Sequence, residues 1–153
     1  MSSVKFKNTR FNPEGTTFLS IAKQMANAFG YTAKLTVEDE LAQLLRLRVA
    51  QKNECAYCVI LHSKTAREIG IAVEKVDNIS SWYNSKLFTA KEKTALTYCD
   101  ALNGGIRVGF DKLHQSMAHY FTQEEITEIA AIIINMNVWT RLKLAQGETP
   151  FFE

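Results

Sequence analysis

The chain has 153 residues, of which 46% are hydrophobic and 22% charged, so it is long enough for one domain with a buried core and too apolar for a disordered chain. The 18 basic and 16 acidic residues are interspersed and give a formal net charge of +2, so we expect no nucleic-acid partner. Residues 1–15 lack the apolar run of a secretory signal and the longest apolar run, residues 129–134, cannot span a membrane, which predicts a cytoplasmic protein with no membrane partner.

The first part of the chain predicts two helices. Apolar residues recur at three- and four-residue steps over residues 18–29, and Gly30 supplies a stop. A second helix is expected to begin after Thr36, whose side chain can cap it, with Asp39 three residues on. It then carries leucine and valine towards Asn53.

The middle of the chain predicts two more helices joined by a short segment. One is expected over residues 55–70. Thr89 and Glu92 form a capping-box pattern that opens the next helix, which runs to about Leu102. The Asn-Gly-Gly sequence at residues 103–105 then ends it, since these residue types tolerate the left-handed conformation.

The last helix is the most apolar. A short helix over residues 111–120 precedes it, and Thr122 with Glu125 forms a second capping-box pattern that starts it and carries it to about Ala145. Because this helix is apolar on most of its circumference, it needs cover on all sides, and a partner subunit is a plausible cover. The pattern as a whole predicts one all-α domain over residues 1–153 that assembles as a homo-oligomer.

Two cysteines and a histidine stand out within the third predicted helix. Cys55, Cys58 and His62 are spaced at i, i+3 and i+7, so a helix places them on one narrow face. Cys58 and His62 lie one turn apart. Cys55 stands at the helix start, where the dipole and free amides stabilise a thiolate.

Three interpretations of this cluster compete. The first is two buried small side chains and a solvent-facing histidine. The second is a zinc site, but structural zinc normally takes four ligands, and the only other histidines, His114 and His119, are distant in sequence. The third, which we favour, is a dithiol that cycles with a disulfide, as expected of a Cys-x-x-Cys pair in a reducing compartment. We expect neither a metal nor a cofactor.

A longer run around the cysteines resembles a known family. Residues 43–67, QLLRLRVAQKNECAYCVILHSKTAR, are similar to the core of the AhpD-like alkylhydroperoxidases, within the carboxymuconolactone decarboxylase superfamily. The likeness continues in residues 82–96 and 137–142 and covers about residues 15–146.

The resemblance implies an all-α AhpD-like fold, an oligomer (commonly a trimer or hexamer) and a thiol peroxidase. It assigns peroxide attack to Cys58, resolution of the sulfenic acid to Cys55, and a place in the proton relay to His62. The helix-dipole argument alone would favour Cys55 as the attacking thiol. The substrate would be hydrogen peroxide or a small organic hydroperoxide, and the electrons would come from an external dithiol.

Two positions depart from the family pattern. The relay glutamate, twelve residues before the first cysteine, is here Gln43, whose amide cannot accept a proton near neutral pH. The glycine that usually precedes the first cysteine is Glu54. One hypothesis is that Glu54 replaces the missing carboxylate. The alternative, which we favour, is that Glu54 points into water at the helix start.

The sequence therefore predicts a peroxidase, with two alternatives. One is a weakly active or non-catalytic oligomer that senses redox state or exchanges disulfides, because Gln43 interrupts the relay. The other is a carboxymuconolactone decarboxylase-type enzyme, against which the Cys-x-x-Cys motif argues, since that branch generally lacks it.

Overall fold

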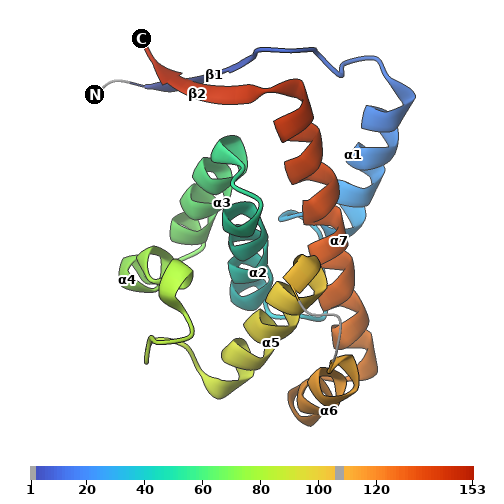
Figure 1. The fold of residues 1–153 in the computed structure, drawn as a ribbon, viewed down its shortest axis with the longest axis vertical. Coiled ribbons are helices and arrows are strands. Elements are labelled where there is room, and N and C mark those ends of the chain that lie inside the picture. Colours follow the sequence, from blue (N-terminus) through green and yellow to red (C-terminus); the bar gives the residue numbers. More distant parts are fainter. Residues whose placement is uncertain (1–2, 106–108) are drawn as a thin grey trace.

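The computed structural model describes residues 3–105 and 109–153. Its elements in chain order are β1 (Val4–Asn8), α1 (Thr17–Phe29), α2 (Asp39–Lys52), α3 (Ala56–Glu68), α4 (Val73–Asp77), the 3-10 turn η1 (Ile79–Ser81), α5 (Ala90–Asp100), the π-helical turn η2 (Ala101–Gly105), α6 (Phe110–Tyr120), α7 (Gln123–Gln146) and β2 (Glu148–Phe152). The predicted helical fold is confirmed, with a small two-stranded sheet added to it (Figure 1).

Helix α2 forms the centre of the molecule. It packs against α3, α5 and α7, and α1 lies against α7 on the other side (Figure 1). Nine of its 14 residues are buried, including the polar Gln43 and Arg46. A helix buried on most of its surface has to satisfy its polar side chains inside the protein. Gln43 and the two terminal nitrogens of Arg46 find hydrogen-bond partners there.

Both capping boxes predicted from the sequence are present. The Glu92 amide donates to Thr89 Oγ1 at 3.1 Å while the Thr89 amide donates to Glu92 Oε2 at 2.8 Å, at the start of α5. Thr122 and Glu125 repeat the arrangement at the start of α7. Each such cap typically stabilises a helix by about 1 kcal/mol.

The predicted cap at Thr36 is wrong. Helix α2 begins at Asp39, and Glu38 at the N-cap position makes no side-chain capping bond. The amides of Thr36 and Val37 instead donate to the carboxylate of Glu128 on α7, at 2.9–3.0 Å. A carboxylate 91 residues away thus holds the approach to the helix, and no local pattern could predict it.

The all-α prediction also missed the sheet. Strands β1 and β2 pair antiparallel from Val4 opposite Phe152 to Asn8 opposite Glu148. Each strand has five residues, and their partners lie at opposite ends of the chain, so neither produces a clear local period. Gly147 ends α7 with a φ of 69°, and a Cβ there would lie 2.1 Å from Thr9 Oγ1, so the turn into β2 requires glycine.

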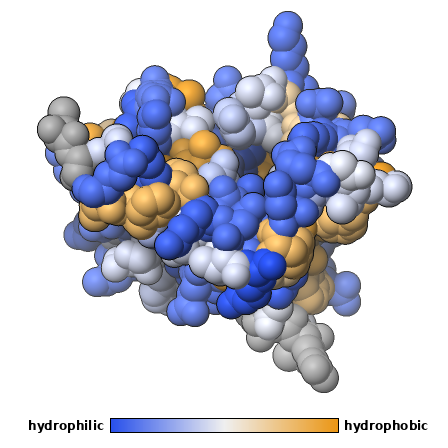
Figure 2. All heavy atoms as spheres, turned by 90° about the horizontal axis from the view of Figure 1, so that it is seen from above, coloured by the Kyte–Doolittle hydropathy of each residue, from blue (hydrophilic) through white to orange (hydrophobic). Residues whose placement is uncertain are grey.

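The outer face of α7 carries apolar side chains that residues 3–105 and 109–153 leave partly exposed. Its inner face supplies Ile129, Ile132, Ile133 and Met136 to the core, but Ile134 is about half exposed. The face shown in Figure 2 is largely hydrophilic, with hydrophobic patches between the hydrophilic side chains. Among the described residues, no helix combines the length and apolar character that crossing a membrane requires.

Candidate active site

The start of α3 brings the two cysteines together. Cys55 occupies the N-cap position with an extended backbone, and its Sγ accepts the Cys58 amide at 3.3 Å. A disulfide joins Cys55 and Cys58, whose Cα atoms are 5.3 Å apart. His62 follows one turn later, and all three side chains are buried, at 2%, 3% and 6% exposed. The structure therefore places the predicted cluster on one helix, in its oxidised form.

Gln43 connects this helix to α2 through hydrogen bonds of fixed direction. Its Nε2 lies 2.9 Å from the backbone oxygen of His62 and 3.0 Å from His62 Nδ1, and its Oε1 accepts from Arg46 Nη1 at 3.2 Å. A guanidinium can only donate and a carbonyl oxygen can only accept, so the amide has one orientation. The amide nitrogen therefore donates to Nδ1 of His62, which places the ring proton on Nε2.

Arg46 is the positive charge behind this network. Its Nη2 donates to the backbone oxygens of Gly30, at 2.9 Å, and Phe29, at 3.2 Å. Burial lowers the pKa of Arg46 to about 10, an effect that Asp39 partly offsets, so the guanidinium is charged at neutral pH. Burial, and then the charge of Arg46, lower the pKa of His62 to about 3. His62 is thus neutral throughout the physiological range.

The depressed pKa of His62 makes stability depend on pH. The unfolded chain binds a proton at about pH 6.5 and the folded chain only near pH 3, so stability is fully present above pH 6.5 and is lost as the pH falls through this window. We expect the free energy of unfolding to fall by about 2 kcal/mol between pH 6.5 and pH 5. Urea unfolding at several pH values measures it. His62→Gln should flatten the dependence, whereas His114→Gln, at an exposed site, should not.

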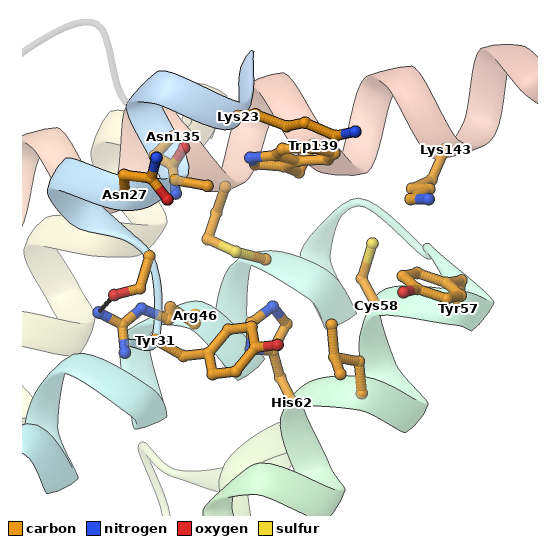
Figure 3. A pocket seen from close by; sticks show the side chains of 14 residues that line it. Lys23, Asn27, Tyr31, Arg46, Tyr57, Cys58, His62, Asn135, Trp139 and Lys143 are labelled. Atoms are coloured by element: carbon orange, nitrogen blue, oxygen red, sulfur yellow. Dashed lines mark hydrogen bonds between the residues drawn. The ribbon is translucent and has the colours of Figure 1, made fainter. Parts of the chain in front are cut away.

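A cavity of about 410 Å³ opens beside these groups (Figure 3). Cys58 and His62 line it from α3, whereas Cys55 is not among the described residues that form its wall. Tyr31 sits at this wall with its ring edge-on to His62, the ring centres 6.1 Å apart. Within the disulfide, Cys58 is therefore the cysteine that a molecule in the cavity would meet.

Tyr57 forms the wall on the other side of Cys58. The ring of Phe6 contacts it edge-on at 4.8 Å, and Lys143 Nζ lies 4.4 Å from its centre. Burial, then the charge of Glu148, raise the pKa of Tyr57, so its hydroxyl stays protonated and can donate a hydrogen bond. The ribbon formed by β1 and β2 thus packs against the residue between the two cysteines, an arrangement the sequence did not indicate.

Glu54 is not part of this arrangement. Its side chain is exposed, makes no hydrogen bond within the described chain, and is not among the described residues that line the cavity. Its backbone has a φ of 53°, in the left-handed region that favours glycine, which accounts for the family's glycine at this position. The structure brings Gln43 to His62 and leaves Glu54 in solvent.

We expect Glu54→Gly to raise the free energy of unfolding by about 1 kcal/mol, because it relieves the left-handed backbone. Chemical denaturation measures this. Glu54→Gln keeps the strain and removes only the charge, so it should change neither stability nor the rate of the peroxide reduction that the family resemblance implies. A rate that falls with Glu54→Gln would instead give the carboxylate a role in proton transfer.

The third cysteine, Cys99, is not among the described residues that line the cavity. Cys99 is fully buried, and burial raises the pKa of its thiol, as suits a core residue. Within residues 3–105 and 109–153, no group of three or more histidine, cysteine, aspartate or glutamate side chains is arranged to share a metal ion.

Comparison with known proteins places this site in a family. The pattern of the carboxymuconolactone decarboxylase family matches residues 21–101, more than half of the chain and the part that carries both cysteines. The chain belongs to the carboxymuconolactone decarboxylase family. The uncharacterised protein YdfG of Bacillus subtilis is 27% identical to this chain over 127 residues, which cover 82% of this chain and 86% of YdfG.

Solved structures confirm the AhpD-like fold of this carboxymuconolactone decarboxylase family member. A protein of unknown function from Agrobacterium tumefaciens, assigned by name to the antioxidant defence protein AhpD, superposes with a TM-score of 0.83 at 25% identity, covering 92% of this chain and 96% of that one. The debrominase Bmp8 shares the fold, with a TM-score of 0.71 at 23% identity over 86% of this chain and 75% of Bmp8.

Sequence reasoning overlooked several residues of the site. Arg46 was part of the motif, but nothing in the sequence indicated that it would orient Gln43. Asn135 and Trp139 face the cavity from α7. The available signal was their i, i+4 spacing, which places an amide and an indole N–H on one face of the helix.

Proposed function

We propose that this protein is a thiol peroxidase that reduces small hydroperoxides with the Cys55–Cys58 dithiol. The observation that carries the proposal is a disulfide-bonded pair of cysteines, one of which, Cys58, lines a cavity beside a buried histidine and arginine. Membership of the family and the AhpD-like fold support a peroxidase-related role.

The reaction balances with a dithiol as the only reductant. The Cys58 thiolate attacks the distal oxygen of the hydroperoxide, the O–O bond breaks, and Cys58 becomes a sulfenic acid while the alkoxide takes a proton and leaves as an alcohol. The Cys55 thiol then displaces water and forms the disulfide seen in the structure. An external dithiol reduces that disulfide by exchange and is itself oxidised to a disulfide.

Cys58 is assigned as the attacking thiol because it borders the cavity. Cys55 lies at the N-cap, where its sulfur already accepts the Cys58 amide, so it is held within reach of the sulfenic acid. The helix-dipole preference for Cys55 concerns only which thiol ionises more readily. Access to the substrate decides which one attacks.

His62 acts in this proposal as a hydrogen-bond donor and not as the base. Gln43 donates to Nδ1, so the neutral ring carries its proton on Nε2 and offers it to an anion. That proton can stabilise the Cys58 thiolate or the departing alkoxide, with the charge of Arg46 behind it. The Cys58 thiol then loses its proton to solvent. The rate of peroxide reduction should therefore rise with pH in a single step, as Cys58 ionises.

Steady-state turnover tests the function. We expect the protein to consume cumene hydroperoxide with dihydrolipoamide or a thioredoxin-type dithiol, and not with a monothiol at the same thiol concentration. Consumption of one dithiol per peroxide supports the proposal. Disulfide reduction without any peroxide consumption would show a disulfide-exchange protein, the alternative that the missing carboxylate at Gln43 favours.

We also propose that the protein works as a homo-oligomer. A shallow apolar groove lies between α1 and α7, lined by Phe18, Ile134, Val138 and Leu142. Phe18 and Ile134 are about half exposed, and an exposed apolar surface of this kind often marks an interface. A second copy of this chain would cover this groove. Sedimentation equilibrium should give a multiple of 17.3 kDa, and Ile134→Lys should reduce it to one chain; a wild-type monomer contradicts the proposal.

A further inference from the structure

Two polar groups on α7 face the cavity without partners. Asn135 is only 2% exposed, and its Oδ1 is buried and accepts no hydrogen bond from any described residue. One turn further along, Nε1 of Trp139 is also buried and donates to no described residue. Figure 3 shows both side chains projecting from α7 towards the cavity. Buried polar atoms are rarely left unpaired, so this pair indicates a polar ligand between α7 and the cysteines.

The charges around the cavity have one sign. Lys23 from α1, Arg46 from α2 and Lys143 from α7 line it, and no aspartate or glutamate does so within the part of the chain that the structure describes. Lys143 is paired with Glu148 at 2.5 Å, but Lys23 reaches Glu14 only at 3.8 Å, with both side chains mostly exposed. Lys23 is thus free to meet an anion at the mouth.

The size and walls of the cavity describe the rest of the ligand. Its volume of about 410 Å³ falls in the range of small-molecule sites and far exceeds what hydrogen peroxide needs, since a water molecule occupies roughly 30 Å³. Ala26, Leu61 and Met136 supply apolar surface between the polar groups. A molecule that fills this space needs an apolar body as well as a polar end.

We propose that the cavity binds organic hydroperoxides that carry a carboxylate, with the carboxylate held by Lys23, the Trp139 indole N–H and the Asn135 amide. The apolar body lies along Leu61 and Met136, which leaves the hydroperoxyl end at Cys58. The Asn135 Oδ1 can only accept, so Asn135 meets the carboxylate through its Nδ2 N–H groups and not through Oδ1. This substrate class rests on the proposed function for its chemistry, but the binding of the carboxylate does not depend on turnover.

Binding of an unreactive product analogue tests the proposal. A medium-chain hydroxy fatty acid and its methyl ester are titrated into the oxidised protein by calorimetry, where no thiol chemistry can occur. We expect the acid to bind at least about tenfold more tightly than the ester, because only the acid gains charge-assisted hydrogen bonds. Equal affinity for acid and ester overturns the proposal.

Matched variants locate the subsite. Trp139→Phe removes the N–H donor and keeps an aromatic ring, and Lys23→Gln removes the positive charge and keeps a polar side chain. Each should weaken binding of the acid about three- to tenfold and have a smaller effect on the ester. Lys64→Gln, on the solvent side of α3, controls for net charge and should change neither. Unchanged affinity of the acid in both cavity variants overturns the assignment.

Kinetics with the reduced protein separate this inference from the proposed function. We expect the hydroperoxide of the same acid to have a higher kcat/KM than its ester, with the difference lost in Lys23→Gln and kept in Lys64→Gln. Tight binding of the acid without any peroxide reduction would contradict the peroxidase function and leave the carboxylate subsite supported. Peroxide reduction with equal kcat/KM for acid and ester would support the function and contradict the subsite.

Discussion

Cys58→Ser is expected to lower the rate of peroxide reduction by about 10³-fold or more, because a serine hydroxyl is scarcely ionised where a thiol forms a nucleophilic thiolate. Cys55→Ser should act differently. Its Cys58 still reacts once with peroxide, but the sulfenic acid has no neighbouring thiol, and turnover with dithiol slows by roughly 10²-fold as the resolving step becomes intermolecular. Stopped-flow measurement of the first turnover, followed by trapping with dimedone, distinguishes the two variants.

The control for this pair is Cys99→Ser. Cys99 is fully buried in the core, and burial raises the pKa of its thiol, so its loss should leave both the first turnover and the steady state unchanged. A first turnover that survives in Cys58→Ser and fails in Cys55→Ser would reverse the assignment of attacking and resolving thiols. That result would favour the helix-dipole argument over access from the cavity.

Gln43→Glu is expected to accelerate the peroxide reaction at neutral pH by about 10- to 100-fold. A carboxylate at this position accepts from Arg46 and from His62 Nδ1, so the ring proton moves to Nδ1 and Nε2 becomes the basic nitrogen of a residue that lines the cavity. The carboxylate also favours the protonated imidazole and raises the pKa of His62 from its value of about 3. The rise of the peroxide reduction rate with pH should therefore occur at lower pH than in the wild type.

Gln43→Leu is the matched comparison, because it removes the hydrogen bonds and adds no charge. It should not accelerate the reaction, and it should destabilise the protein by removing the bonds of the Gln43 side chain to the His62 backbone oxygen and to Nη1 of Arg46. The nitrogen NMR chemical shifts of the His62 ring show which ring nitrogen carries the proton. Wild-type His62 with its proton on Nδ1, or a pH profile identical in wild type and Gln43→Glu, would contradict the assigned role of Gln43.

The sequence predicted the features whose causes are local. A threonine and a glutamate three residues apart are sufficient to form a capping box, and both predicted boxes are present, at Thr89 and Thr122. The spacing of Cys55, Cys58 and His62 on one helix is likewise a property of consecutive residues. The family resemblance is carried by a continuous run, so it was readable without the fold.

Features that join distant segments could not be predicted in this way. Glu128 binds the amides of Thr36 and Val37 because α7 passes that point, which only the packed fold determines. The orientation of Gln43 depends on Arg46 and on a backbone oxygen of another helix, so the sequence showed a missing carboxylate but not the tautomer that its absence imposes. The position of Asn135 and Trp139 at the cavity depends on how α7 packs against the other helices, so the sequence did not indicate it.

The stoichiometry of one oxidation tests the central claim most directly. The fully reduced protein is mixed with one equivalent of cumene hydroperoxide, and free thiols, alcohol product and disulfide position are measured together. The proposed function predicts two thiols lost and one alcohol formed per chain, a Cys55–Cys58 disulfide in the digest, and Cys99 still free. Peroxide left unconsumed with all thiols intact, or consumed while Cys55 and Cys58 remain reduced, would contradict it.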